Sequence, residues 1–132
     1  LMMKILFLNN FKNQQKRGKE NTFFYNSTLI AFQYARWGEI TRRIFEASSC
    51  GCCVITNKLE KSKNIEKIFK HNESIIFYEN RFDLIIEIFK LILNKNKRKR
   101  IAYNGEFIVR NFHTAKVRVK ELIKIVDDNI YD

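Results

Sequence analysis

Short apolar runs alternate along this sequence with segments of helical periodicity, and this alternation limits the folds that the chain can adopt. Each run is largely free of charge and ends in a polar turn, which is typical of a strand buried on both faces. Because helical segments separate the runs, we expect parallel βαβ units whose crossover helices cover the sheet. The predicted strands span residues 3–8, 28–33, 52–56 and 74–78.

The segments between and after these runs carry apolar residues at intervals of three and four, the spacing of one helix face. Gly51 stands where a left-handed residue often ends a helix, and Asn80 is a favourable N-cap that Asp83 can answer from the first turn. Residues 12–21 and 94–97 are polar, so we expect a loop and a basic linker there. The predicted helices span residues 41–50, 64–70, 81–93, 98–111 and a last segment after Thr114.

The chain of 132 residues has the usual length of one domain, so we treat residues 1–132 as a single α/β unit. The predicted fold is a parallel sheet flanked by helices, with a helical C-terminal end. Ligands of such sheets bind outside the carboxyl ends of the strands. Residues 38–43 join a predicted strand to a predicted helix at such a place. The apolar residues expected to face inward in the last two helices are Ile101, Ala102, Phe107, Ile108, Val117, Leu122, Ile125 and Val126.

The formal net charge is +11, which favours acidic partners such as nucleic acid, anionic lipid or phosphorylated ligands. A generally basic, solvated surface explains the same excess without any dedicated site. No apolar run has the length of about 18 residues that a membrane span needs, and the N-terminus lacks a signal-peptide cleavage region. These features lead us to expect a cytoplasmic protein. The chain begins with Leu1 rather than Met, which suggests that it is cut from a longer polypeptide.

Cys50, Cys52 and Cys53 form the one cysteine cluster of the sequence. Zinc sites need a second pair of ligands, but His71 and His113 are isolated in the sequence. Three clustered cysteines also make no balanced disulfide framework, which favours a reducing compartment. We therefore expect buried packing residues and no metal site.

The predicted helix at residues 41–50 begins with an unusual concentration of charge. Arg42 and Arg43 oppose the positive end of the helix dipole, unless an anion such as a phosphate joins them. Glu39 and Glu46 can accept hydrogen bonds from vicinal hydroxyl groups. The combination suits a ligand with phosphates and sugar hydroxyls. It also suits a solvated surface on which Arg42 and Glu46 form an (i, i+4) ion pair.

The run of residues 39–51, followed by Val54-Ile55-Thr56, closely resembles the R-x-F-E-A-x-A-C-G-x-x-V-I-T signature of bacterial group 1, spore-maturation-like glycosyltransferases. Further similar pieces follow in the order of that family, at residues 65–69, 73–78, 83–84, 100–105 and 113–114. The resemblance covers roughly residues 28–126. Each piece alone is weakly specific, but their shared order and spacing are fairly specific.

The resemblance implies the C-terminal, donor-binding domain of a GT-B enzyme, which has two Rossmann-like domains. Glu46 matches the glutamate that holds the ribose of the nucleotide-sugar donor. Related transferases have a second glutamate eight positions earlier, facing the sugar, whereas here Glu39 precedes Glu46 by seven. The diphosphate is then expected near the helix start at Thr41, with Arg42 and Arg43, and Gly38 in the preceding segment is a further donor-binding candidate.

The resemblance further implies a metal-independent glycosyltransferase that binds its donor without a cofactor. The N-terminal acceptor domain of such an enzyme has no counterpart in the sequence, so we expect the isolated chain to be inactive and to expose an apolar patch. One alternative is a basic nucleic-acid-binding module, with Phe23, Phe24 and Tyr25 as its aromatic cluster. Most phenylalanines fall on inward positions, which argues against nucleic acid as a partner. Another alternative is a degenerate, non-catalytic domain that pairs with a second chain.

Overall fold

The computed structural model describes residues 5–7, 19–37, 39–58 and 64–130. Its centre is a four-stranded sheet of order β1-β2-β3-β4, in which every neighbouring pair is parallel. This arrangement confirms the predicted fold class. Residues 3, 4 and 8 of the first predicted strand lie outside the described residues. The strands are β1 (Ile5–Phe7), β2 (Ile30–Gln33), β3 (Cys53–Asn57) and β4 (Ile76–Tyr78).

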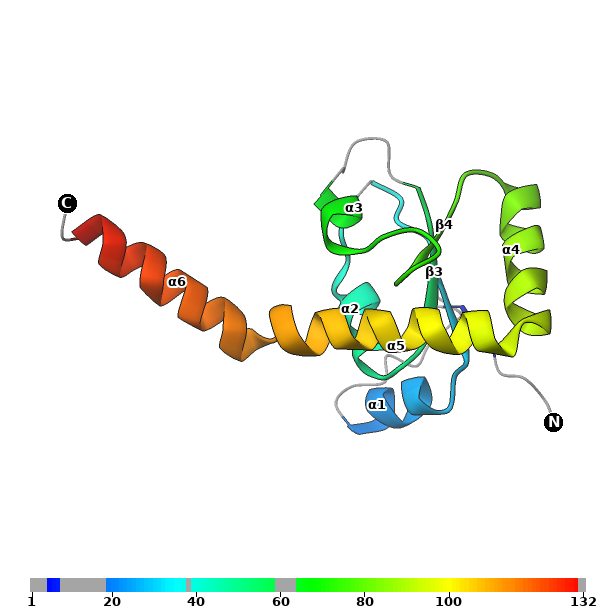
Figure 1. Ribbon diagram of the computed structural model, residues 1–132, viewed down its shortest axis with the longest axis horizontal. Coiled ribbons are helices and arrows are strands. Elements are labelled where there is room, and N and C mark those ends of the chain that lie inside the picture. The colour runs from blue at the N-terminus through cyan, green and yellow to red at the C-terminus, as the bar shows by residue number, and fades with distance from the viewer. Residues whose placement is uncertain (1–4, 8–18, 38, 59–63, 131–132) are drawn as a thin grey trace.

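Helices cover both faces of this sheet (Figure 1). Alternate strand residues divide between two apolar clusters: Val54 of β3 belongs to one, while Cys53 and Ile55 belong to the other. The first cluster also holds buried residues of α1, α2 and α3, and the second holds Leu91 of α4. The helices are α1 (Lys19–Asn26), α2 (Arg42–Ser49), α3 (Asn64–Ile68), α4 (Arg81–Leu93), α5 (Lys95–Phe112) and α6 (Ala115–Ile130).

The ends of α2 and α4 follow the signals in the sequence. Gly51 has a φ of +73° and its N–H donates to the Ser48 carbonyl at 2.9 Å, which closes the last turn of α2. Asn80 caps α4 by accepting from the N–H groups of Phe82 and Asp83, each at 3.0 Å. Both predicted helix ends are therefore confirmed. Asp83 differs in its partner, because its Oδ2 accepts from the N–H of Glu79 rather than from that of Asn80.

The helix α1 was not expected from the sequence. The predicted polar loop at residues 12–21 is wrong at its end, since α1 begins at Lys19; residues 12–18 lie outside the described residues. The cluster Phe23-Phe24-Tyr25 is part of this helix. Tyr25 is 3% exposed and packs in the first apolar cluster, whereas Phe23 is 76% exposed. Helical geometry thus separates neighbours that the sequence presents as one aromatic cluster.

The predicted linker at residues 94–97 is also wrong. Asn94 is the N-cap of α5 and accepts from the N–H of Lys97 at 2.8 Å, so that the helix begins at Lys95. Lys97 lies 3.7 Å from the buried carboxylate of Glu87, and the guanidinium of Arg98 donates to the Leu91 carbonyl. The composition of this segment suggested a linker, but contacts with α4 stabilise it as the first turn of a helix.

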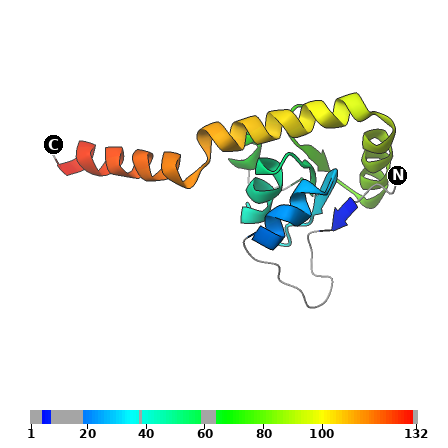
Figure 2. The same cartoon turned by 90° about the horizontal axis from the view of Figure 1, so that it is seen from below.

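Three helices carry apolar side chains that the described part of the chain does not cover. Phe107 of α5 is 51% exposed, contrary to its predicted inward position. The helix α6 extends away from the domain (Figure 2), and none of its residues from 115 to 129 is buried. Its predicted inward residues Leu122, Ile125 and Val126 are exposed, and Val117 is half-buried. One face of α4 exposes five large side chains, those of Phe82, Ile85, Ile86, Phe89 and Leu93. No described helix is both long enough and apolar enough to cross a membrane.

Candidate functional site

The connection between β2 and α2 lies at the carboxyl edge of the sheet and forms a closed loop. The side-chain amide of Gln33, the last residue of β2, donates to the hydroxyl of Thr41 at the start of α2. Ala35 is tied to the end of β3, because its N–H donates to Asn57 Oδ1 at 2.8 Å and its carbonyl accepts from Asn57 Nδ2 at 3.1 Å. These bonds fix the base of the loop on two neighbouring strands.

Gln33 also presents an unpaired acceptor at this base. Its side chain is buried, with 1% of the residue exposed, and its amide oxygen has no hydrogen-bond partner among the described residues. A buried polar atom without a partner costs about 1–3 kcal/mol. The floor of the loop therefore holds a group that a donor beyond the described residues, such as one on a bound ligand, would satisfy.

The first turn of α2 combines a positive helix end with two cations. Thr41 occupies the N-cap position with extended backbone, but its side chain caps no backbone N–H of the helix. No acidic residue stands in this first turn, and the side chains of Arg42 and Arg43 are exposed. A negatively charged group would be favoured at this place both by the helix dipole and by the guanidinium groups.

Glu46 lies one turn further along α2 and contacts two of its neighbours. Its Oε1 pairs with Arg42 Nε at 2.9 Å, and its Oε2 accepts from Asn21 Nδ2 of α1 at 3.3 Å. Tyr25 lies beside this carboxylate. Burial raises the pKa of Tyr25 to about 12, and the negative charge of Glu46 adds to that effect. The structure therefore brings Glu46 and Arg42 together and adds α1 residues that sequence patterns did not indicate.

Glu39 occupies the loop itself rather than the helix. Its side chain is exposed, and its Oε2 accepts from the backbone N–H of Trp37 at 2.9 Å. Gly38, the remaining predicted site residue, lies outside the described residues. Trp37 follows β2 with 87% of its surface exposed, and it was not among the predicted site residues. The sequence could have indicated this residue, because Trp37 is the one tryptophan of the chain and lies at the predicted binding edge.

The cysteines pack as expected at two of their three positions. Cys52 and Cys53 are buried, and burial raises the pKa of each thiol to about 12. Cys52 Sγ donates to the Tyr25 carbonyl at 3.2 Å, while Cys50 is only half-buried. Within the described part of the chain, no group of three or more His, Cys, Asp or Glu side chains could hold a metal ion.

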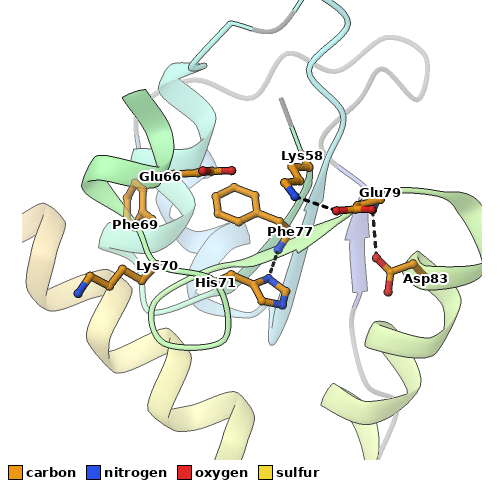
Figure 3. A pocket seen from close by; sticks show the side chains of 8 residues that line it. All are labelled: Lys58, Glu66, Phe69, Lys70, His71, Phe77, Glu79 and Asp83. Carbon is orange, nitrogen blue, oxygen red and sulfur yellow. Dashed lines mark hydrogen bonds and ion pairs between the residues drawn. The ribbon is translucent and has the colours of Figure 1, made fainter. Parts of the chain in front are cut away.

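A cavity of about 420 Å³ is lined in part by Lys58 and Glu79, which follow the carboxyl ends of β3 and β4 (Figure 3). His71 Nδ1 accepts from the N–H of Phe77 at 3.0 Å, and Lys58 pairs with Glu79 at 2.8 Å. The His71 ring thus occupies one N–H group of the edge strand β4, which makes that group unavailable for pairing with another chain. None of the predicted site residues lines this cavity. Its lining residues are Lys58, Glu66, Phe69, Lys70, His71, Phe77, Glu79 and Asp83.

Comparison with known proteins identifies the family of this chain. A family model described as glycosyl transferase-like matches residues 11–124. The structure is similar to the crystal structure of the C-terminal domain of a group 1 family glycosyl transferase, LpcC, from Francisella tularensis, with a TM-score of 0.60 and 20% sequence identity. The similarity covers 70% of this chain and 47% of that one, so the match spans about half of the solved domain. No protein with a curated description matches significantly in sequence. Because the family model covers most of the sequence, the chain belongs to the glycosyl transferase-like family.

Proposed function

We propose that this chain binds the nucleotide diphosphate-sugar donor of a glycosyl transfer reaction at the β2–α2 connection. The observation that carries the proposal is the start of α2, where a first turn with two cations and no acid precedes the carboxylate of Glu46 by one turn. Family membership and the position of this start at the carboxyl edge of a parallel sheet support the same proposal.

Each part of the donor has a partner of suitable chemistry in this proposal. The diphosphate lies against the start of α2, with Thr41, Arg42 and Arg43 around it and Gly38 close by in sequence. The ribose hydroxyls donate to Glu46, and the hydroxyls of the sugar donate to Glu39, because ionised carboxylates act only as acceptors. The contact between Arg42 and Glu46 is an exposed (i, i+4) pair of a kind that contributes about 0.3–0.5 kcal/mol. A phosphate can therefore take over the guanidinium at little cost.

Transfer breaks the bond between the sugar and the diphosphate and forms a bond from the sugar to an acceptor oxygen, which loses its proton. The charge that develops on the leaving diphosphate would be stabilised by the two arginines and the helix start, without a metal ion. We further propose that a second, acceptor-binding domain completes the enzyme and that the reaction takes place in the cytoplasm. The apolar face of α4 supports a partner of this kind, since exposed apolar stripes commonly mark surfaces that pack against other polypeptide.

Calorimetry on the whole chain tests donor recognition against simple charge attraction. We expect at least one nucleoside diphosphate among UDP, GDP and ADP to bind, and inorganic phosphate to bind much more weakly. A single-stranded RNA of random sequence serves as the competing polyanion, titrated at low and high salt. Tight binding of that RNA with a steep salt dependence, and without preference for any nucleotide, would replace the proposal by a nucleic-acid-binding module.

A further inference from the structure

The β2–α2 loop presents a tryptophan almost entirely to solvent. Trp37 is 87% exposed, and Tyr34 of the same loop is 47% exposed. Tryptophan is highly buried on average, and its large apolar surface contributes stability only where water is excluded from it. Exposure of this ring at the ligand-binding edge of a parallel sheet suggests that another molecule covers it.

Hydrogen bonds hold the two ends of the segment that carries this ring. Gln33 and Thr41 are hydrogen-bonded across the two ends, and Asn57 makes two hydrogen bonds with Ala35. Trp37 therefore belongs to a short connection that is anchored on two strands. This anchoring limits the positions of the backbone that carries the indole, which lowers the entropy lost when a ligand orders it.

A carboxylate is hydrogen-bonded to the backbone of the same residue. Glu39 Oε2 accepts from the backbone N–H of Trp37 at 2.9 Å, which holds the carboxylate close to the backbone that carries the indole. An ionised carboxyl group has about four lone-pair sites, and this hydrogen bond uses only one of them. The two side chains therefore offer an exposed aromatic ring together with remaining acceptor positions.

We propose that Trp37 stacks on the sugar ring of the donor while Glu39 accepts hydrogen bonds from its hydroxyls. A pyranose has a face of C–H groups, which suits the negative face of an aromatic ring, and a rim of hydroxyls that donate to a carboxylate. A nucleobase would stack on the indole equally well, but the vicinal hydroxyls of its ribose are assigned to Glu46 in the proposed function, which leaves Glu39 for the hydroxyls of the sugar. This inference rests on the proposed donor-binding function and assigns a part of that site to the sugar.

The fluorescence of Trp37 tests the inference directly, because it is the one tryptophan of the chain. We would titrate the whole chain with UDP-glucose, GDP-mannose and ADP-glucose, and in parallel with UDP, GDP and ADP. For the nucleotide that binds, we expect the sugar-bearing form to change the emission strongly and the diphosphate to change it little. An equal change with the diphosphate alone would overturn the sugar assignment in favour of the base.

Calorimetry on variants separates this inference from the proposed function. Trp37→Ala should weaken binding of the sugar nucleotide by about 2- to 10-fold, the usual worth of an aromatic contact, and leave binding of the diphosphate unchanged. Phe82→Ala is the matched control, since Phe82 is 80% exposed on α4 and should affect neither ligand. Donor binding with no response from Trp37 overturns this inference alone. Failure of every nucleotide to bind overturns the proposed function and this inference together.

Discussion

Arg42 and Glu46 contact each other across one turn of α2, with Arg42 Nε 2.9 Å from Glu46 Oε1. In the proposed complex the same two side chains part, Arg42 toward phosphate and Glu46 toward ribose. The side chain of Arg42 is 88% exposed and that of Glu46 is 32% exposed, so water already screens much of their attraction. The pair therefore neutralises both groups in the free chain without preventing either from engaging a donor.

Glu46→Ala should weaken binding of the recognised nucleoside diphosphate by about 1.5–3 kcal/mol, the usual range for a hydrogen bond to a charged group. Calorimetry measures this change, and circular dichroism checks that the fold is intact. Glu73→Ala provides the control, because Glu73 is also exposed but lies outside the β2–α2 connection. Equal affinities of the parent chain and Glu46→Ala would remove Glu46 from the site.

The buried thiols make stability depend on pH in the alkaline range. Burial raises the pKa of Cys52 and Cys53 from the ordinary value of 9.0 to about 12. The unfolded chain therefore loses these protons first as the pH rises. The stabilisation is complete below about pH 9 and is lost as the pH rises toward 12.

Denaturant titrations at pH 7 and pH 10 should give a lower free energy of unfolding at pH 10, and the double variant Cys52→Ala/Cys53→Ala should reduce that difference. Iodoacetamide labelling at pH 8, followed by mass spectrometry, should modify the half-buried Cys50 before the other two. Simultaneous labelling of all three thiols in the folded chain would contradict the burial of Cys52 and Cys53.

Gly105 should tolerate no side chain, although it lies inside α5. A Cβ atom at this position would stand 2.8 Å from the Ser74 carbonyl oxygen, which belongs to the backbone and cannot turn away. Alanine normally improves a helix interior by about 0.5–1 kcal/mol relative to glycine. Here we expect Gly105→Ala to lower stability by about 1–3 kcal/mol, as overpacking does. Thermal denaturation measures the effect, with Tyr103→Ala on the exposed side of α5 as the control; a raised melting temperature would refute the close packing.

The sequence predicted the elements whose local signals agree with their tertiary role. The start of α2 at Thr41 and its end at Gly51 both follow from capping chemistry and an apolar face, and the structure bears them out. Because the position of this helix could be predicted, the charged residues at its start could also be named as candidate site residues. The partners of Glu46 could not, because Asn21 lies 25 positions away in a helix that lacks a clear apolar period.

Apolar patterns gave wrong predictions of burial in helices whose apolar face has no covering element in the described structure. The helices α4 and α6 both have apolar stripes, yet only one face of α4 packs on the sheet, and none of the residues 115–129 of α6 is buried. Periodicity identifies a face that needs a partner, but it does not show that the partner belongs to the same stretch of sequence. The segment after Asn94 shows the opposite error, because a basic segment without an apolar pattern is helical. The Asn94 cap and the contact of Lys97 with Glu87 stabilise that helix.

Glycosyl transfer should be undetectable with the isolated chain. Holding donor and acceptor at reacting distance contributes about 7–11 kcal/mol of barrier reduction, and a donor site alone cannot supply the acceptor's position. Product formation from UDP-glucose, GDP-mannose and ADP-glucose would be followed with the chain alone and with a longer polypeptide that carries an acceptor-binding domain. Equal rates for the two would contradict the need for that second domain.

The location of the bound nucleotide tests the account most directly. A two-dimensional ¹H–¹⁵N NMR titration of the labelled chain with the recognised nucleoside diphosphate reports every backbone amide at once. We predict that the largest shifts fall on Thr41, Arg42, Arg43 and Glu46, with the amides of His71 and Phe77 at the β4 cavity unaffected. Shifts centred on that cavity, or no shifts at saturating nucleotide, would contradict donor binding at the β2–α2 connection.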